Sequence, residues 1–285
     1  MKISKPLKWH GGKHYLADRI IELMPPHTHY VEPYAGGLSV LFAKPAELIE
    51  GYSEVVNDLN GGLTNFWRVL ADEKDFEHLV RLLEATPVSE VRFKESLNFT
   101  ELIGVYWAAD FFVRYRQSRQ GLGKDFATLS RNRTRRGMNE QASSWLSAIE
   151  GLPESHERLK RVVVLNRDAI DVIRQQDGPN TFFYLDPPYL HETRVTTDDY
   201  EYEMNEDEHE ALLDTLGHVK GRFILSGYRS DLYDRVANYY GWHRNDIEID
   251  NKASSKKTKD KKTECLWMNF VPSTDNQRGD NDFIA

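Results

Sequence analysis

Short apolar segments alternate with helical segments toward both ends of this 285-residue chain. Seven segments have the apolar or β-branched character of buried strands, at residues 29–36, 54–58, 162–166, 181–189, 222–228, 242–249 and 264–271. Segments with helical spacing separate several of them, at residues 168–176, 206–216 and 230–240. This alternation predicts a mostly parallel, doubly wound α/β sheet. The last two strands have no helix between them, which predicts that they pair antiparallel.

Residues 66–157 interrupt the alternation. This region lacks convincing strands, and its sequence favours helices at 65–85, 100–118 and 139–152. We therefore predict a core domain formed by residues 1–65 and 158–285, with a mostly helical insertion at 66–157.

Several classes of protein are excluded by what the sequence does not contain. It has no run of 18 apolar residues, which predicts that no helix spans a membrane. Its start lacks the apolar core of a secretory signal. Its single cysteine, Cys265, can form neither an intrachain disulfide nor a cysteine-based zinc site, and no metal is expected. These features predict a cytoplasmic protein.

The net charge of -8 argues against a nucleic-acid partner, but the charges are unevenly distributed. Residues 114–136 contain eight basic residues and one acid, Asp125. A second basic cluster, of lysines, occupies 252–262, whereas acids are concentrated between Glu192 and Asp214. Because salt screens charges beyond roughly 8 Å, local charge decides what a phosphate backbone experiences.

The sequence Asp186-Pro187-Pro188-Tyr189 ends the apolar strand at 181–189. In open α/β sheets, ligands bind beyond the carboxyl ends of the strands, where this motif is expected. The exocyclic amine of a base is a poor nucleophile because its lone pair is delocalised into the ring. The Asp186 carboxylate and the Pro187 carbonyl can accept its two N–H bonds, and Tyr189 offers a flat face for stacking an extruded base. Such catalysis depends on positioning and electrostatics.

Two further motifs indicate a nucleoside site. Val-Glu-Pro-Tyr-Ala-Gly-Gly (31–37) ends the first strand, but it is not the fingerprint of a nicotinamide-binding loop. Asp58 ends the second strand, where an acid can bind both ribose hydroxyls, and Glu32 ends the first. Lys-Trp-His-Gly-Gly-Lys (8–13) is a glycine turn flanked by an aromatic residue and two cations, suited to hold a carboxylate or a nucleoside.

These motifs, in this order, resemble the D12 (Dam-type) class of DNA adenine-N6 methyltransferases. Phe-Ile-Leu-Ser-Gly-Tyr (223–228) and the closing Lys-Lys-Thr-Glu-Cys-Leu-Trp-Met-Asn-Phe (261–270) extend the resemblance over nearly the whole chain. The resemblance implies a Rossmann-like domain that uses S-adenosylmethionine, with a target-recognition insertion at 66–157. Two departures concern cofactor affinity rather than reaction type: His10 replaces a small residue, and Leu38 replaces a glycine.

The resemblance implies an enzyme that flips an adenine from double-stranded DNA and methylates its N6. The catalytic residues would be Asp186, Pro187, Pro188 and Tyr189. Residues that would bind the cofactor are Trp9, Lys13, Glu32, Tyr34, Gly36, Asp58, Asp168 and Asp186. Tyr34 and Gly36 would line the methionine pocket, Asp168 would lie near the cofactor adenine, and Asp186 would serve cofactor and base alike.

Within the expected insertion, the basic segment favours DNA contact over a merely solvated face. The predicted DNA-binding residues are Lys8, Arg116, Arg119, Lys124, Arg131, Arg133, Arg135 and Arg136. The lysine cluster at 252–262 fits a phosphate-binding loop and a solvated loop about equally well. The acidic segment at 191–207 is interpreted as a lid ordered by substrate.

Three alternative functions stay open from the residues alone: cytosine-N4 methylation, RNA methylation, and DNA binding without catalysis. Cytosine-C5 methylation is disfavoured, because it needs a cysteine nucleophile and Cys265 lies in an apolar strand. No obligate protein partner is evident. The resemblance leaves open whether a restriction endonuclease accompanies the chain, and whether the source is bacterial or a phage.

Overall fold

The computed structural model describes residues 3–98, 103–127, 130–190, 203–250 and 261–272. The chain forms two compact units. The first unit comprises Met1–Ile21, Gly36–Glu50 and Asp58–Asn166, and the second comprises Glu22–Ala35, Gly51–Asn57 and Arg167–Ala285. This division into two units does not test the boundaries of the insertion at residues 66 and 157, which stay a prediction.

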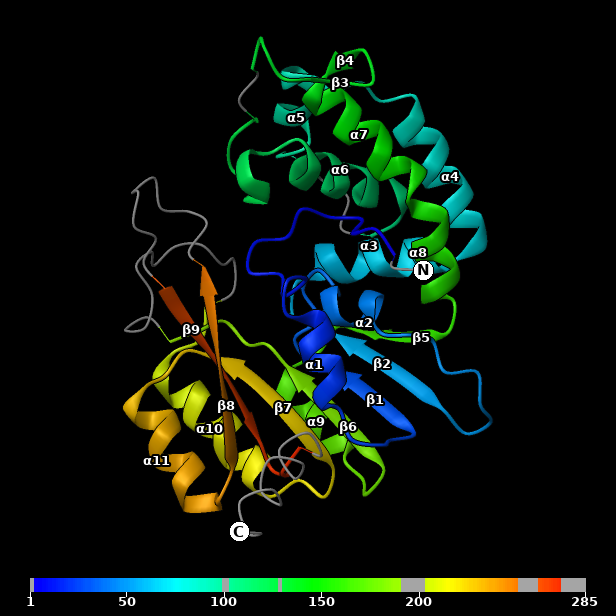
Figure 1. Cartoon of the computed structure of the whole chain (residues 1–285). Helices are drawn as coiled ribbons and strands as arrows, with labels where there is room; N and C mark the ends of the chain where they lie inside the picture. The colour runs from blue at the N-terminus through cyan, green and yellow to red at the C-terminus, as the bar shows by residue number, and fades with distance from the viewer. Residues whose placement is uncertain (1–2, 99–102, 128–129, 191–202, 251–260, 273–285) are drawn as a thin grey trace, which may run out of the picture. The chain divides into compact units, whose positions relative to one another are not determined.

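In the part of the second unit that the structure describes, six strands form a sheet. They are β1 (His29–Glu32), β2 (Ser53–Asn57), β6 (Thr181–Leu185), β7 (Arg222–Gly227), β8 (His243–Asp250) and β9 (Lys261–Met268). Their order is β2-β1-β6-β7-β9-β8 (Figure 1). The first four run parallel, β9 is antiparallel to β7, and β8 is antiparallel to β9. The predicted mixed α/β fold and the antiparallel final pair are confirmed.

Three helices complete the described part of the second unit: α9 (Ala169–Gln176), α10 (Glu206–Gly217) and α11 (Asp231–Tyr240). Each begins where a polar side chain accepts backbone N–H groups that lack a helical partner. Asp168 caps α9, Asn205 forms a capping box with Glu208 at α10, and Ser230 caps α11. Helices α10 and α11 lie side by side (Figure 1).

Two strands end earlier than the sequence pattern predicts, because proline intervenes. β6 ends at Leu185 rather than at 189, and β1 ends at Glu32 rather than at 36. Pro187, Pro188 and Pro33 have no N–H group to donate to a neighbouring strand. All five residues of β6 are buried, so the strand places Asp186 directly beyond a rigid core.

The first unit is mainly helical, as predicted for most of this region. Its helices are α2 (Ser39–Ala43), α3 (Gly61–Ala71), α4 (Glu73–Glu84), α5 (Glu90–Glu95), α6 (Val105–Arg116), η1 (Arg119–Gly121), α7 (Glu140–Glu150) and α8 (Leu152–Leu159). α1 (Ala17–Leu23) begins here and ends in the second unit, and β5 (Val162–Leu165) also belongs to the first unit. Aromatic rings of Phe66, Phe111, Phe112 and Trp145 form part of its core.

The expectation that residues 66–157 contain no strands is wrong at one place. β3 (Thr134–Arg135) and β4 (Met138–Asn139) form an antiparallel hairpin. Arg136 and Gly137 connect them with positive φ angles of 53° and 73°. This is the geometry of a type I′ turn, whose usual sequence is Asn-Gly or Asp-Gly. Because Arg136 stands where Asn or Asp is usual, the sequence pattern does not predict this turn.

Gly121 and Gly137 provide a matched test of how the basic segment packs. Both have left-handed φ angles, 74° and 73°, where alanine costs about 1–2 kcal/mol. A Cβ atom on Gly121 would lie 2.2 Å from the Lys8 carbonyl oxygen, whereas one on Gly137 would meet nothing within 4 Å. We expect Gly121→Ala to lower the Tm by several degrees more than Gly137→Ala, measured by circular dichroism. Equal Tm values would contradict the close packing of η1 on the N-terminal segment.

Candidate active site

The Asp-Pro-Pro-Tyr turn follows β6, and a hydrogen bond joins its two ends. The Tyr189 hydroxyl lies 3.2 Å from Asp186 Oδ1 and also hydrogen-bonds Glu264 Oε1. Burial raises the pKa of Tyr189 well above its usual value, and the Asp186 and Glu264 carboxylates add to this effect. Tyr189 therefore stays a neutral phenol, while half-buried Asp186 is positioned at the carboxyl end of the strand.

Residues of β7 and of the loop after it contact the turn and the strand β6 that precedes it. The ring of Tyr228, directly after β7, meets the Tyr189 ring edge-on, with centroids 4.7 Å apart and planes inclined by 75°. Within the sheet, the Tyr184 hydroxyl of β6 hydrogen-bonds Ser226 of β7. These contacts give the Phe-Ile-Leu-Ser-Gly-Tyr motif a structural role beside the turn.

Glu264 is a site residue that the sequence analysis missed. It lies in β9 and is fully buried, with an exposed fraction of 0%. The sequence contains a signal for it, because an acid next to the apolar run Cys265-Leu266-Trp267-Met268 is unusual for a core strand. The resemblance covers the closing motif but gives Glu264 no role.

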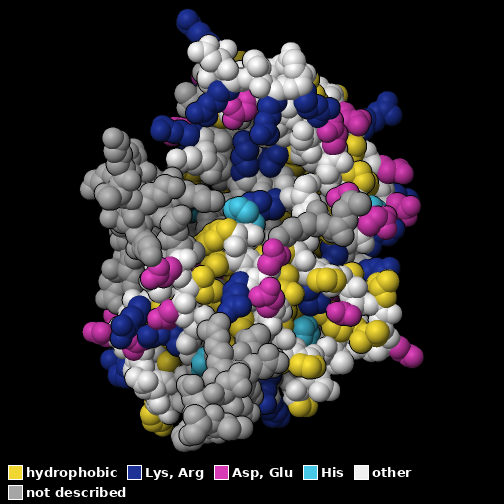
Figure 2. Space-filling model, viewed as in Figure 1, with side chains coloured by type: hydrophobic (Ala, Val, Ile, Leu, Met, Phe, Trp, Pro, Cys, Tyr) yellow, Lys and Arg dark blue, Asp and Glu magenta, His cyan; other side chains and the backbone are white. Residues whose placement is uncertain are grey.

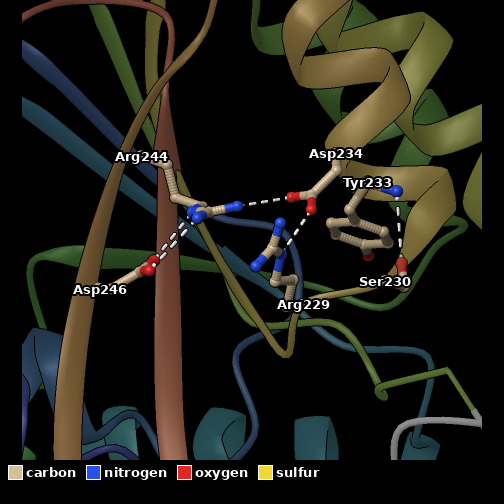
Figure 3. Close-up of polar contacts among 6 residues, drawn as sticks. All are labelled: Arg229, Ser230, Tyr233, Asp234, Arg244 and Asp246. Atoms are coloured by element: carbon tan, nitrogen blue, oxygen red, sulfur yellow. Dashed lines mark hydrogen bonds and ion pairs between the residues drawn. The ribbon is translucent and has the colours of Figure 1, made fainter.

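A network of charged side chains fixes the segment that follows Tyr228. Arg229 donates from Nε to Asp234 on α11 at 2.6 Å, and Arg244 on β8 donates to the other Asp234 oxygen at 2.6 Å. Arg244 also pairs with Asp246 at 2.9 Å (Figure 3). These side chains line a cavity of about 460 Å³. Their ion pairs connect the loop after β7 to α11 and to the edge strand β8.

In the first unit, three predicted cofactor residues lie together. Gly36 N–H donates to Asp58 Oδ2 at 2.9 Å, and Asn60 N–H donates to Asp58 Oδ1 at 2.9 Å. The Trp9 side chain fills the space above the glycines, because a Cβ on Gly36 would lie 2.9 Å from Trp9 Nε1 and one on Gly37 2.8 Å from Trp9 Cβ. Glycine is therefore required at both positions, and Asp58 orients the loop.

The other predicted cofactor residues have separate local environments. Lys13 is buried and donates to the Gly11 carbonyl at 3.0 Å, and Tyr34 is half-buried. Glu32 is buried and accepts a hydrogen bond from the Tyr30 hydroxyl at 2.6 Å. Burial is the main cause that raises the pKa of Tyr30, and the nearby Glu32 carboxylate raises it further. Asp168 is exposed and accepts from the N–H groups of Ile170 and Asp171 at the start of α9.

The predicted DNA-binding residues fall into two groups. Lys8 Nζ donates to the Arg116 carbonyl at 3.1 Å, and Arg116 donates to the Ser144 carbonyl at 3.0 Å. Burial lowers the pKa of Arg116 to about 10 and that of Lys8 below its usual value. Both side chains therefore contribute to packing within the first unit. The other group is exposed, and comprises Arg119, Lys124, Arg131, Arg133, Arg135 and Arg136.

Exposed cations gather on the visible face of the first unit (Figure 2). Arg136 forms two hydrogen bonds with Glu150, at 2.8 and 2.9 Å, whereas Arg133 lies 3.9 Å from Glu140. Lys5, Lys8 and Arg119 line a cavity of about 400 Å³ together with Trp9, Gln120 and Gln141. The acidic segment, over 191–202, and the lysine cluster, over 251–260, lie outside the described residues.

Cys265 is buried in β9, in agreement with its interpretation as a core residue. Burial and the neighbouring Asp246 raise the pKa of its thiol to about 12. The thiolate, which is the nucleophilic form, is therefore scarce at neutral pH. Among the described residues, no cluster of three or more His, Cys, Asp or Glu side chains is arranged to hold a metal ion, and no helix is long and apolar enough to cross a bilayer.

The mostly parallel α/β sheet, with the Asp-Pro-Pro-Tyr turn beyond β6, is consistent with the fold of a methyltransferase. The chain belongs to the D12 class N6 adenine-specific DNA methyltransferase family, whose family model matches residues 9–246. It is thus an adenine-specific DNA methyltransferase, and nothing in the family match favours the alternative functions. A search of curated proteins found no match.

Proposed function

We propose that the chain transfers the methyl group of S-adenosylmethionine to N6 of an adenine flipped out of double-stranded DNA. The observation that carries this proposal is the Asp-Pro-Pro-Tyr turn on the buried strand β6. Asp186 accepts one N–H of the adenine amine, and the Pro187 carbonyl accepts the other. These two acceptors concentrate electron density on N6 and orient its lone pair toward the methyl group.

The turn is well suited to hold these acceptors still. The rings of Pro187 and Pro188 restrict the main chain, so the Pro187 carbonyl has a fixed direction. Tyr189 bonds Asp186 across the turn, and Tyr228 fixes the plane of its ring. We propose that Pro188 shapes the turn, and the stacking of the base on Tyr189, whose side chain is 6% exposed, stays a prediction.

The residues present suit S-adenosylmethionine, which supplies an activated methyl group when bound. The carboxylate of this cofactor binds best to a cation, and its amino group and ribose hydroxyls bind best to carboxylates. Its adenine packs best on an apolar or aromatic surface. The glycine loop held by Asp58 and covered by Trp9 supports the assignment most directly. The residues proposed to bind it are Trp9, Lys13, Glu32, Tyr34, Gly36, Asp58, Asp168 and Asp186.

We propose the region at 66–157 as the target-recognition domain. Its exposed cations, Arg119, Lys124, Arg131, Arg133 and Arg135, are accessible to phosphates and base edges. Lys8 and Arg116 would act on DNA mainly by holding this surface in place, and Arg136 would have to leave Glu150. For the lysine cluster at 252–262, a phosphate-binding loop and a solvated loop both stay open. The acidic segment at 191–207 is proposed as a lid ordered by substrate. A DNA substrate supports a cytoplasmic location. Whether a restriction endonuclease acts together with this chain stays an open question.

Transfer of a labelled methyl group tests the cofactor and the form of nucleic acid together. The purified chain is incubated with methyl-tritiated S-adenosylmethionine and either duplex DNA or structured RNA of equal adenine content. We expect label in the duplex DNA and background counts in the RNA, because the matching family consists of DNA methyltransferases. Label confined to RNA would contradict the proposal, and so would DNA binding without any transfer.

A further inference from the structure

One hydroxyl group in the second unit contacts two carboxyl groups. The Tyr189 oxygen lies 3.2 Å from Asp186 Oδ1 and also hydrogen-bonds Glu264 Oε1. A phenol has a single proton to donate, although its oxygen can accept further bonds. The three side chains are therefore coupled, because the orientation of the hydroxyl toward one carboxyl group affects the other.

The burial of the three side chains increases from Asp186 to Glu264. Asp186 is half-buried, Tyr189 is 6% exposed and Glu264 is 0% exposed. A buried carboxyl group costs free energy unless it is well hydrogen-bonded, and an apolar side chain would suit the interior of β9 better. Packing alone thus gives no reason for an acid at this position.

The sheet holds Glu264 in a fixed place relative to the turn. β9 pairs with β7, which puts Cys265 opposite Gly227, and β8 pairs with β9 through Ile247 and Glu264. Tyr228, directly after Gly227, contacts the Tyr189 ring edge-on. The backbone of β9 and the ring of Tyr228 therefore restrain the Tyr189 hydroxyl from two directions.

We propose that Glu264 is a positioning residue for methyl transfer, which acts through the Tyr189 hydroxyl to orient the Asp186 carboxylate. Asp186 and Tyr189 bracket Pro187 and Pro188, so restraining both ends of the turn also fixes the Pro187 carbonyl. Because Glu264 is fully buried, the proposal gives it no contact with the base or the cofactor. The inference rests on the proposed function, in which Asp186 and the Pro187 carbonyl accept the amine.

A double-mutant cycle tests this role. Glu264→Leu removes the carboxyl group, Tyr189→Phe removes only the hydroxyl, and the double variant removes both. We expect each single variant to slow single-turnover transfer up to about 100-fold, with unchanged affinity for duplex DNA, because a small misplacement of an acceptor is costly. The double variant should be no slower than Tyr189→Phe alone, since Glu264 acts only through that hydroxyl.

Two controls separate positioning from a general effect on the fold. Thr181→Val removes a buried, hydrogen-bonded hydroxyl from the opposite end of β6 and should leave the rate unchanged. Glu264→Gln keeps the shape and the hydrogen-bonding capacity of the side chain, and should restore the rate to within about threefold of the parent chain. If Glu264→Leu does not fold, Tyr189→Phe decides, because a parental rate in that variant overturns the proposal.

The proposal would also be overturned if the rate losses of the two single variants were additive in the double variant, or if a folded Glu264→Leu variant kept the parental rate. Failure of the proposed function has a different signature, because the parent chain itself would then transfer no methyl group to duplex DNA. The outcomes of the two hypotheses are therefore distinguishable in one set of assays.

Discussion

Replacing Asp186 with alanine is expected to lower the rate of methyl transfer by on the order of 10²–10³-fold, in a chain that stays folded and still binds DNA. The reason is that Asp186 supplies the charged acceptor for the adenine amine. It lies beyond the buried strand β6 and is held by Tyr189. Single-turnover assays with saturating S-adenosylmethionine measure the chemical step directly.

Asp171→Ala is the matched control for this variant. It removes the same charge from an exposed position on α9 of the same unit and should leave transfer unchanged. Asp186→Asn keeps the size and one acceptor oxygen but loses the charge, so its rate should fall between those of the parent and the alanine variant. A parental rate in Asp186→Ala would remove the proposed role of this carboxylate.

DNA affinity is expected to fall steeply with salt, because the exposed cations of the first unit are proposed to contact phosphates. If Arg119, Lys124, Arg131, Arg133 and Arg135 each contact one phosphate, the logarithmic slope is about -4.5. Between 50 and 200 mM salt the affinity then weakens roughly 500-fold. Fluorescence anisotropy of a labelled duplex, repeated over a salt series, measures this slope.

Arg133→Ala should reduce the magnitude of the slope by about 1 and weaken binding across DNA sequences. Lys94→Ala is the matched control, since it removes one exposed positive charge from α5, outside the basic segment. Its slope should equal that of the parent chain. A flat salt response in the parent would show that the basic segment does not contact phosphates.

The sequence predicted the strand cores well but their ends poorly. Apolar runs identify β6 and β1 because both strands are buried. The prolines that follow were included in the predicted strands, although they cannot pair. The β3–β4 hairpin was missed because its strands are two residues long and its turn uses Arg136 in a left-handed conformation.

The candidate site was predicted only as far as single motifs allow. Trp9, Gly36 and Asp58 were selected separately, and their mutual contacts depend on a backbone approach that no sequence pattern encodes. Glu264 was missed because it lies 75 residues from Tyr189 along the chain. The predicted DNA-binding residues are alike in sequence, yet Lys8 and Arg116 donate hydrogen bonds to main-chain oxygens.

The central claim is that this chain methylates N6 of adenine. The most direct test is mass analysis of nucleosides from duplex DNA treated with the purified chain and S-adenosylmethionine. The fold, the Asp-Pro-Pro-Tyr turn and the family match predict N6-methyladenine as the product, with far less formed in the same time by the Asp186→Ala variant. The appearance of N4-methylcytosine without N6-methyladenine would contradict the account.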